Sequence, residues 1–93
     1  MSVAATIGSM SAGHCFFPRP TYQGSSNVLI GGLPAHTIGM SWPVHICGKF
    51  SHPSITAMGS PNVLVNGKPL ARVGDRLSCG DMIASGSPNV LVN

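Results

Sequence analysis

Histidine and cysteine side chains are the candidate metal ligands of this 93-residue chain, and three of them recur at matching places in a repeat. The repeat unit is the octapeptide Gly-Ser-Pro-Asn-Val-Leu-Val-Asn, of which the first copy is a variant. Its copies occupy residues 24–31, 59–66 and 86–93. His52 and Cys79 each lie seven residues before a copy, and His14 lies in the longer connection that precedes the first copy. Each repeat therefore offers one potential ligand at a corresponding corner of the fold.

A fourth candidate ligand comes from an insertion between the first two copies. These copies begin 35 residues apart, against 27 for the next pair, and the additional eight residues bring in His45. A tetrahedral set of imidazole nitrogens and a thiolate suits Zn²⁺. We therefore predict one structural zinc ion with the ligands His14, His45, His52 and Cys79.

The remaining histidine and cysteines are expected to have other roles. Cys47 is the main alternative to His45 as the fourth ligand; otherwise Cys15 and Cys47 are expected to be small buried thiols. A disulfide framework is not expected, because the cysteines are odd in number and no secretion signal precedes them. His36 takes the place that Ala71 has in the next repeat, away from the ligand corner. We expect a surface histidine there, whose removal has little effect.

An enzyme is not expected from these residues. A catalytic zinc keeps an open coordination position and needs a general base nearby, whereas four protein ligands close the shell. The carboxylates of the chain are Asp75 and Asp81, and both are explained by turns. A nucleophilic pair of a cysteine with a histidine is conceivable at Cys79 or Cys15, but turns also explain the Gly and Asp residues around them.

Composition indicates one all-β domain, residues 1–93, with almost no helix. Only 8% of the residues are charged, while 12 are Gly and 8 are Pro, which is typical of many turns between short strands. The net charge of +3 comes from scattered Lys and Arg, so nucleic-acid binding is not expected. The N-terminus lacks the regions of a secretion signal, and no apolar run approaches membrane-spanning length, which favours synthesis in the cytoplasm.

Short hairpins are expected around the two-residue turns Asn66-Gly67 and Gly31-Gly32, because such turns need positive φ angles. The last copy lacks a return strand, but residues 4–8 resemble the return strand 70–74, so the N-terminal strand should complete the third repeat beside Asn93. The three hairpins should form a compact cone with pseudo-three-fold symmetry. Their Val and Leu residues alternate between two faces, and both faces are expected to be covered. The aromatic residues expected in the small core are Phe16, Phe17, Tyr22, Trp42 and Phe50.

The string from Val65 to Asp75 resembles the signature of the PAAR-repeat family, whose name records Pro-Ala-Ala-Arg where this chain has Pro-Leu-Ala-Arg at 69–72. The resemblance covers the whole chain, although the first copy reads Pro-Ala-His-Thr at 34–37. The stretches 13–20 and 41–48 are similar to the versions found in contractile phage tails and bacterial type VI secretion systems.

This resemblance implies a cone with zinc near its apex, held by three His and one Cys, for which the matching residues are His14, His45, His52 and Cys79. It implies a wide base that caps a trimeric β-helical spike protein, one chain per trimer. Such a tip is made in the cytoplasm and is driven through a target membrane. Its final location is outside the cell, in a target cell or in a phage virion. Any effectors are expected to bind to it non-covalently. The alternative is a free-standing zinc-binding β-domain that acts as an adaptor.

Overall fold

The computed structural model describes residues 2–13, 18–47 and 50–93, and over these ranges the chain is all β, with no helix. The expected all-β class without helix is thereby confirmed for the described residues. Its strands are β1 (Ser2–Ala4), β2 (Leu29–Ile30), β3 (Leu33–Pro34), β4 (Ser41–Cys47), β5 (Phe50–Ile55), β6 (Leu64–Val65), β7 (Lys68–Pro69) and β8 (Ser87–Val92). They pair as β1–β8, β2–β3, β4–β5 and β6–β7, all antiparallel. No helix that could cross a membrane occurs in the described ranges.

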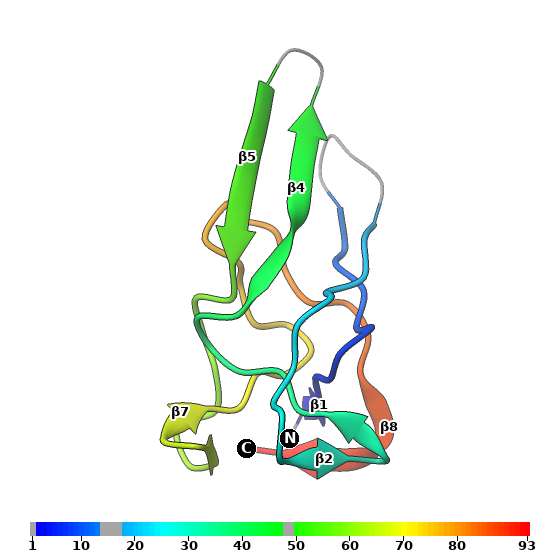
Figure 1. The fold of residues 1–93 in the computed structure, drawn as a ribbon, viewed down its shortest axis with the longest axis vertical. Coiled ribbons are helices and arrows are strands. Elements are labelled where there is room, and N and C mark those ends of the chain that lie inside the picture. Colours follow the sequence, from blue (N-terminus) through cyan, green and yellow to red (C-terminus); the bar gives the residue numbers. More distant parts are fainter. Residues whose placement is uncertain (1, 14–17, 48–49) are drawn as a thin grey trace.

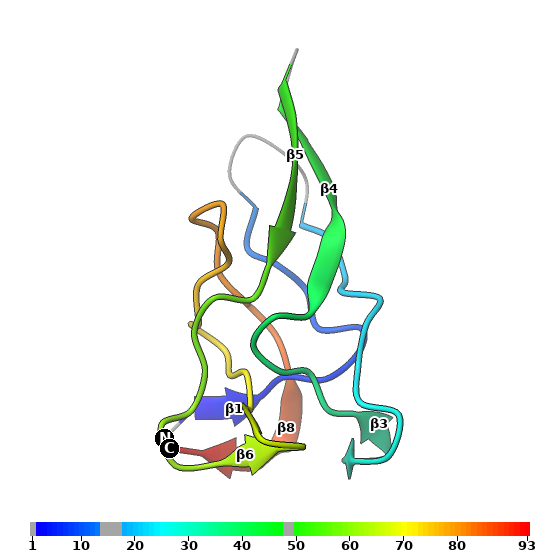
Figure 2. The same ribbon diagram turned by 60° about the vertical axis from the view of Figure 1, so that its left-hand side comes forward.

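The hairpins occupy the two ends of an elongated body. β1–β8, β2–β3 and β6–β7 lie together at one end, and β4–β5 runs away from them toward the other (Figures 1 and 2). The molecule measures 37 × 23 × 21 Å along its principal axes. We call the end formed by the three short hairpins the broad end.

The three hairpins of the broad end share one register. β2–β3 pairs Ile30 with Leu33 and β6–β7 pairs Val65 with Lys68. Asn66 and Gly67 turn the chain with φ angles of 54° and 81°, as the Asn-Gly pair predicts. In β1–β8, Ser2 pairs with Val92 at the corresponding position, so this hairpin joins residues from the two ends of the chain. Met1 lies outside the described residues.

Packing at the broad end separates the two faces of the octapeptide. Val65 and Val92 are buried in a cluster with Ala4, Ala35 and Leu70, and Val28, Ile30, Val63 and Val90 pack against it. The leucines face outward: Leu29 is 62% exposed, Leu64 61% and Leu91 56%. The expectation that both faces are covered is therefore wrong for this chain by itself, because only the valine face packs against the rest of the chain.

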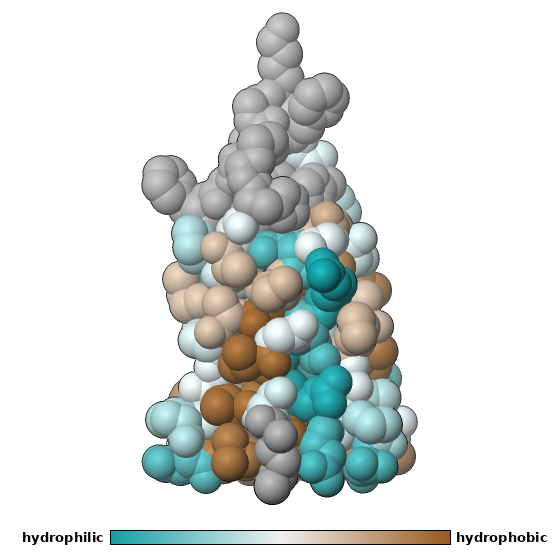
Figure 3. All heavy atoms as spheres, turned by 180° about the vertical axis from the view of Figure 1, so that it is seen from behind, coloured by the Kyte–Doolittle hydropathy of each residue, from teal (hydrophilic) through white to brown (hydrophobic). Residues whose placement is uncertain are grey.

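A second cluster lies nearer β4 and contains Ala5, Trp42, Ala71, Leu77 and Ile83. Trp42 is 2% exposed, which confirms its predicted place in the core. Tyr22, in contrast, is 63% exposed, so its assignment to the core was wrong. Phe16 and Phe17 lie outside the described residues, as does the side chain of Phe50. Hydrophobic and hydrophilic atoms form adjacent strips on the face shown in Figure 3.

Three buried backbone segments meet at the second cluster in a closed ring of hydrogen bonds. The amide of Ala5 donates to the carbonyl of Ala71 (2.9 Å), Ala71 donates to His36 (2.9 Å), and His36 donates to Ala5 (3.1 Å). All three residues are 0% exposed. We call this arrangement the central ring.

His36 is therefore buried, and its expected place on the surface was wrong. Its Nδ1 lies 2.9 Å from the carbonyl oxygen of Gln23, and its Nε2 lies 2.6 Å from Oγ1 of Thr56. Trp42 Nε1 donates to the same Oγ1 (2.9 Å), and the Trp42 and His36 rings meet edge to face at 5.4 Å. Because a carbonyl can only accept, Nδ1 carries the proton, and the Thr56 hydroxyl donates to Nε2. The repeat register placed His36 correctly, but the neighbours that bury it come from other connections.

We expect His36→Ala to lower the free energy of unfolding by about 2–4 kcal/mol, because it opens a cavity beside Trp42 and removes two buried hydrogen bonds. Urea denaturation followed by Trp42 fluorescence measures this change. Lys68→Ala, at an exposed position of β7, is the control and should stay within about 0.5 kcal/mol of the wild type. An unchanged midpoint for His36→Ala would contradict the buried network.

The same burial predicts a pH dependence of stability. Desolvation lowers the pKa of His36 from its ordinary value of 6.5, against the raising effect of the Gln23 hydrogen bond. The unfolded chain therefore takes up a proton first, so this contribution to stability is complete above pH 6.5 and is lost as the pH falls toward the lowered pKa. His36→Gln should show a shallower loss of stability below pH 6.5 than the wild type at equal added zinc. Parallel slopes for the two proteins would contradict this.

Candidate metal centre

The predicted ligands come from three connections between the repeats. His45 lies in β4 and His52 in β5, and the structure describes the backbone of both. Cys79 lies in the turn between Arg76 and Met82, which form an isolated antiparallel bridge. His14 and its neighbour Cys15 lie outside the described residues.

His45 and His52 are direct partners in the β4–β5 ladder. Residues directly opposite one another in an antiparallel pair lie on the same face of the ladder. Cys47, two positions along β4, pairs with Phe50 and shares that face by the alternation of the strand. The register thus brings two predicted ligands together and retains Cys47 as the alternative to His45.

The inserted residues lengthen the β4–β5 hairpin rather than forming a separate unit. Corresponding residue pairs open the three connections, namely Met10–Pro20, Ser41–Ile55 and Arg76–Met82. We call the last of these, residues 76–82, the Cys79 turn. The repeat register predicts that the segments around His52 and Cys79 are equivalent corners. This prediction is wrong, because Cys79 lies in a turn whereas His52 lies within a strand. The connections that carry His52 and Cys79 correspond at their opening residue pairs. They differ beyond these pairs, because the insertion extends the β4–β5 ladder.

The Cys79 turn is bonded to β5 on one side. The amide of Ser78 donates to the carbonyl of Ile55 (2.8 Å), and the amide of Ile55 donates to Oγ of Ser78 (3.1 Å). Thr56 also bridges Leu77. The turn that carries Cys79 is therefore attached to the strand that carries His52.

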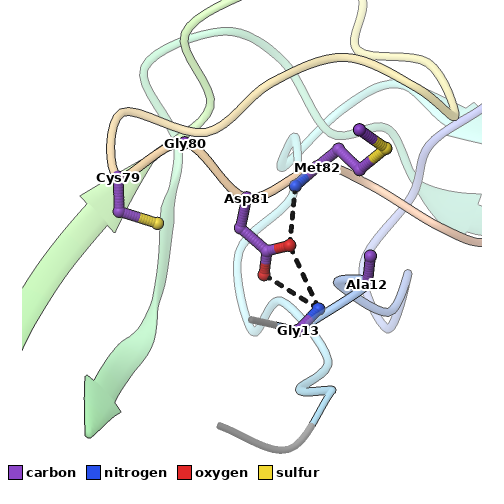
Figure 4. Close-up of a pocket in the computed structure, with 6 residues that line it drawn as sticks. All are labelled: Ala12, Gly13, Cys79, Gly80, Asp81 and Met82. Atoms are coloured by element: carbon purple, nitrogen blue, oxygen red, sulfur yellow. Dashed lines mark hydrogen bonds between the residues drawn. The ribbon is translucent and has the colours of Figure 1, made fainter. Parts of the chain in front are cut away.

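The Cys79 turn is bonded to the N-terminal segment on its other side (Figure 4). Asp81, which is 4% exposed, accepts the amide of Gly13 at both carboxylate oxygens (3.0 and 3.1 Å) and the amide of Met82 at Oδ1 (2.8 Å). Ala12 also donates to the carbonyl of Met82 (2.9 Å). Gly13 directly precedes His14, so these bonds bring the segment leading to His14 up to the turn that carries Cys79.

An open hollow of about 340 Å³ adjoins these bonds. Its walls are formed by Ala12, Gly13, Cys79, Gly80, Asp81 and Met82. Cys79 is half-buried. In Figure 4 the Cys79 sulfur and the Asp81 carboxylate project from the same turn, with the carboxylate directed at Gly13. The hollow thus lies at the junction of the connections that carry His14 and Cys79.

Among the side chains that the structure describes, which leave out residues 45–50 and His52, no three His, Cys, Asp or Glu residues form a group that could hold a metal ion. His14 and the side chains of His45 and His52 lie outside what is described, so the set of four ligands stays a prediction. The donor chemistry suits zinc, and the described backbone brings the three connections together. The four predicted ligands therefore fit a zinc site in their donor atoms and in the connections that carry them.

Two residues that flank Cys79 were not predicted from the sequence to contact other connections. Ser78 and Asp81 use their side chains to accept backbone amides from two other connections, Ile55 and Gly13. Asp81 had been explained by its own turn, and its bond to Met82 agrees with that role. A carboxylate two residues after a predicted ligand was the available signal, but its partner Gly13 lies 68 residues away.

The family model described as PAAR motif matches residues 18–85, a range that includes His45, His52 and Cys79 and begins after His14. No curated protein matches the chain.

Proposed function

Because the chain belongs to the PAAR-repeat family, we propose that it is the non-enzymatic tip of a contractile injection machine, capping the trimeric spike of a type VI secretion system or a phage tail. The observation that supports this most is the broad end, where three hairpins of equal register present a leucine each. The proposal has two parts, a spike-binding base and a zinc-bound apex.

A pseudo-three-fold base is supported by the bridges between repeats. Thr6 bridges Ala35, Thr37 bridges Leu70, and Arg72 bridges Ala4. In repeat register the three bridges join equivalent positions. Each repeat is bridged to the next, and the last is bridged back to the first. A cycle of this kind supports the proposal of a base that matches the symmetry of a trimeric partner.

The surface of the base suits a protein partner. Leu29, Leu64 and Leu91, which we call the leucine triad, occupy the same octapeptide position and are each more than half exposed. Exposed apolar side chains that are grouped mark interaction sites more often than scattered ones do. Each hairpin has two strands and so leaves edges that strands of a β-helical spike could pair. We therefore propose one chain per spike trimer, bound through the leucine triad.

We propose a single structural zinc at the other end, bound by His14, His45, His52 and Cys79. Its support is the pairing of His45 with His52 and the bonds from the Cys79 turn to Ile55 and Gly13. When bound, zinc would cross-link three connections and add to the folding free energy of a small domain. In this proposal a chain made in the cytoplasm is mounted on the spike, pierces a target membrane, and ends outside the cell, in a target cell, or in a virion; effectors attach by contact.

Leu64→Asp should weaken binding to a trimeric spike by at least about tenfold, because a charge would be buried where an apolar side chain docks. Binding is measured by light scattering after chromatography with β-helical end fragments of several spikes. The expected complex contains one chain and three spike subunits. Val44→Asp, a half-exposed strand position far from the base, is the matched control and should bind as the wild type does.

Absence of a complex between the wild-type chain and every spike fragment would instead favour the free-standing adaptor. Equal binding by Leu64→Asp and the wild type would place the spike on another surface. The half-buried Val63 offers a further comparison, since Val63→Asp should destabilise the fold itself.

Zinc content should be one per wild-type chain by elemental analysis of protein purified without chelator. Cys79→Ser and His52→Ala should lose most of this zinc and several kcal/mol of stability. His36→Ala is the control, because it should be less stable yet retain zinc. A wild-type chain without metal would end the zinc proposal, whereas loss of zinc in Cys47→Ser but not in His45→Ala would exchange those two ligands.

A further inference from the structure

Asp81 is a buried carboxylate whose hydrogen bonds all come from backbone amides in the described part of the chain. Gly13 donates to both of its oxygens and Met82 to one of them. A buried carboxylate is costly unless hydrogen bonds satisfy it, and bonds from amides to a charged oxygen are among the stronger ones. By contrast Asp75, the other carboxylate, pairs with the guanidinium of Arg72 at 2.8 Å.

The bond to Gly13 ends a short series of contacts that hold the N-terminal segment against the Cys79 turn. Ser11 bridges Ile83, Ala12 donates to the carbonyl of Met82, and Gly13 donates to Asp81. The first two contacts use backbone groups alone, so they do not depend on which side chain occupies position 81. The third depends on a side-chain acceptor, and it is the last described contact before His14.

Ser78 makes the corresponding contact on the other side of Cys79. Its Oγ accepts the amide of Ile55, three residues along β5 from His52. Cys79 is thus flanked by two side chains, each of which anchors the backbone that leads to another predicted ligand. An arrangement in which outer residues hold ligand segments in place is common around metal sites, where losing such a residue typically lowers affinity about 10–100-fold.

We propose that Asp81 is a positioning residue of the metal centre, which fixes Gly13 and so holds the His14 connection beside Cys79. The inference rests on the proposed zinc site and assigns Asp81 no bond to the metal. The connection that leads to His14 is then fixed when the protein folds, before zinc binds. Less conformational entropy is lost on zinc binding, and the zinc affinity is higher.

A residue that only shaped its own turn would act differently. The Asp81–Met82 bond is local, so its loss would lower the stability of the whole domain and leave the zinc affinity of the folded protein unchanged. Asp81→Asn separates these roles. Its remaining oxygen can still accept the Met82 amide, but the charge is lost and an NH2 donor replaces Oδ2 opposite the Gly13 amide, which is itself a donor.

The test is the zinc dissociation constant of folded protein, measured by competition with a chromophoric chelator. Asp81→Asn should weaken zinc binding about 10–100-fold. Asp75→Asn is the matched control: Asp75 is equally buried, but its partner is Arg72, so zinc affinity should stay within about threefold of wild type even if stability falls. With Co²⁺ in place of zinc, Asp81→Asn should keep the wild-type absorption bands, because the ligands are unchanged.

Each other outcome contradicts a different part of the argument. If the wild type binds zinc and Asp81→Asn binds it equally well, the positioning role is wrong and the metal site stands. If the wild type binds no zinc, the metal site and the role of Asp81 fall together. Altered Co²⁺ bands would make Asp81 a ligand instead. Should Asp81→Asn not fold, Asp81→Glu keeps the charge but displaces the oxygens, and wild-type affinity in that variant would overturn the proposal.

Discussion

The central ring is the constraint on which the rest of the structure depends. Three segments that are distant in sequence exchange backbone hydrogen bonds at Ala5, His36 and Ala71, with no side chain between them and no exposure to water. Buried amides and carbonyls need hydrogen-bond partners, and here each of the three segments supplies the partner of another. Moving one segment away would therefore leave buried polar groups of the other two unpaired. Two ring positions hold alanine, and the third holds a side chain that extends sideways to Thr56 and Trp42.

The two ends of the molecule are stabilised by different interactions. At the broad end, the inward valines bury apolar surface and the first glycine of each octapeptide lets the chain pass close to the following strand. A Cβ on Gly24 would lie 2.7 Å from Cβ of Pro34, and one on Gly59 would lie 2.8 Å from Cβ of Pro69. At the opposite end the described contacts between connections are mainly hydrogen bonds, such as those of Ser78 and Asp81. A metal ion bound there would cross-link connections that the described residues join mainly by hydrogen bonds.

This division agrees with the proposed function, in which the broad end binds the spike and the opposite end carries the zinc. The exposed leucines of the base can contact a partner while the buried valines stay packed, because alternate residues of a strand face opposite sides. The His36–Thr56–Trp42 network lies between the ends and joins the start of β4 to the central ring.

The sequence alone determined the features that depend on neighbouring residues. The octapeptide and its Asn-Gly or Gly-Gly turns predict the hairpins, since turn geometry and strand alternation are local, and repeat register correctly equated His36 with Ala71. Tertiary structure decided which octapeptide face is exposed, that Tyr22 is exposed and His36 buried, and that Asp81 bonds to Gly13. These outcomes depend on which distant segments pack together, and the burial of a side chain is set by those neighbours rather than by its own type. The ligand set remains what repeat register predicts, supported by the pairing of His45 with His52.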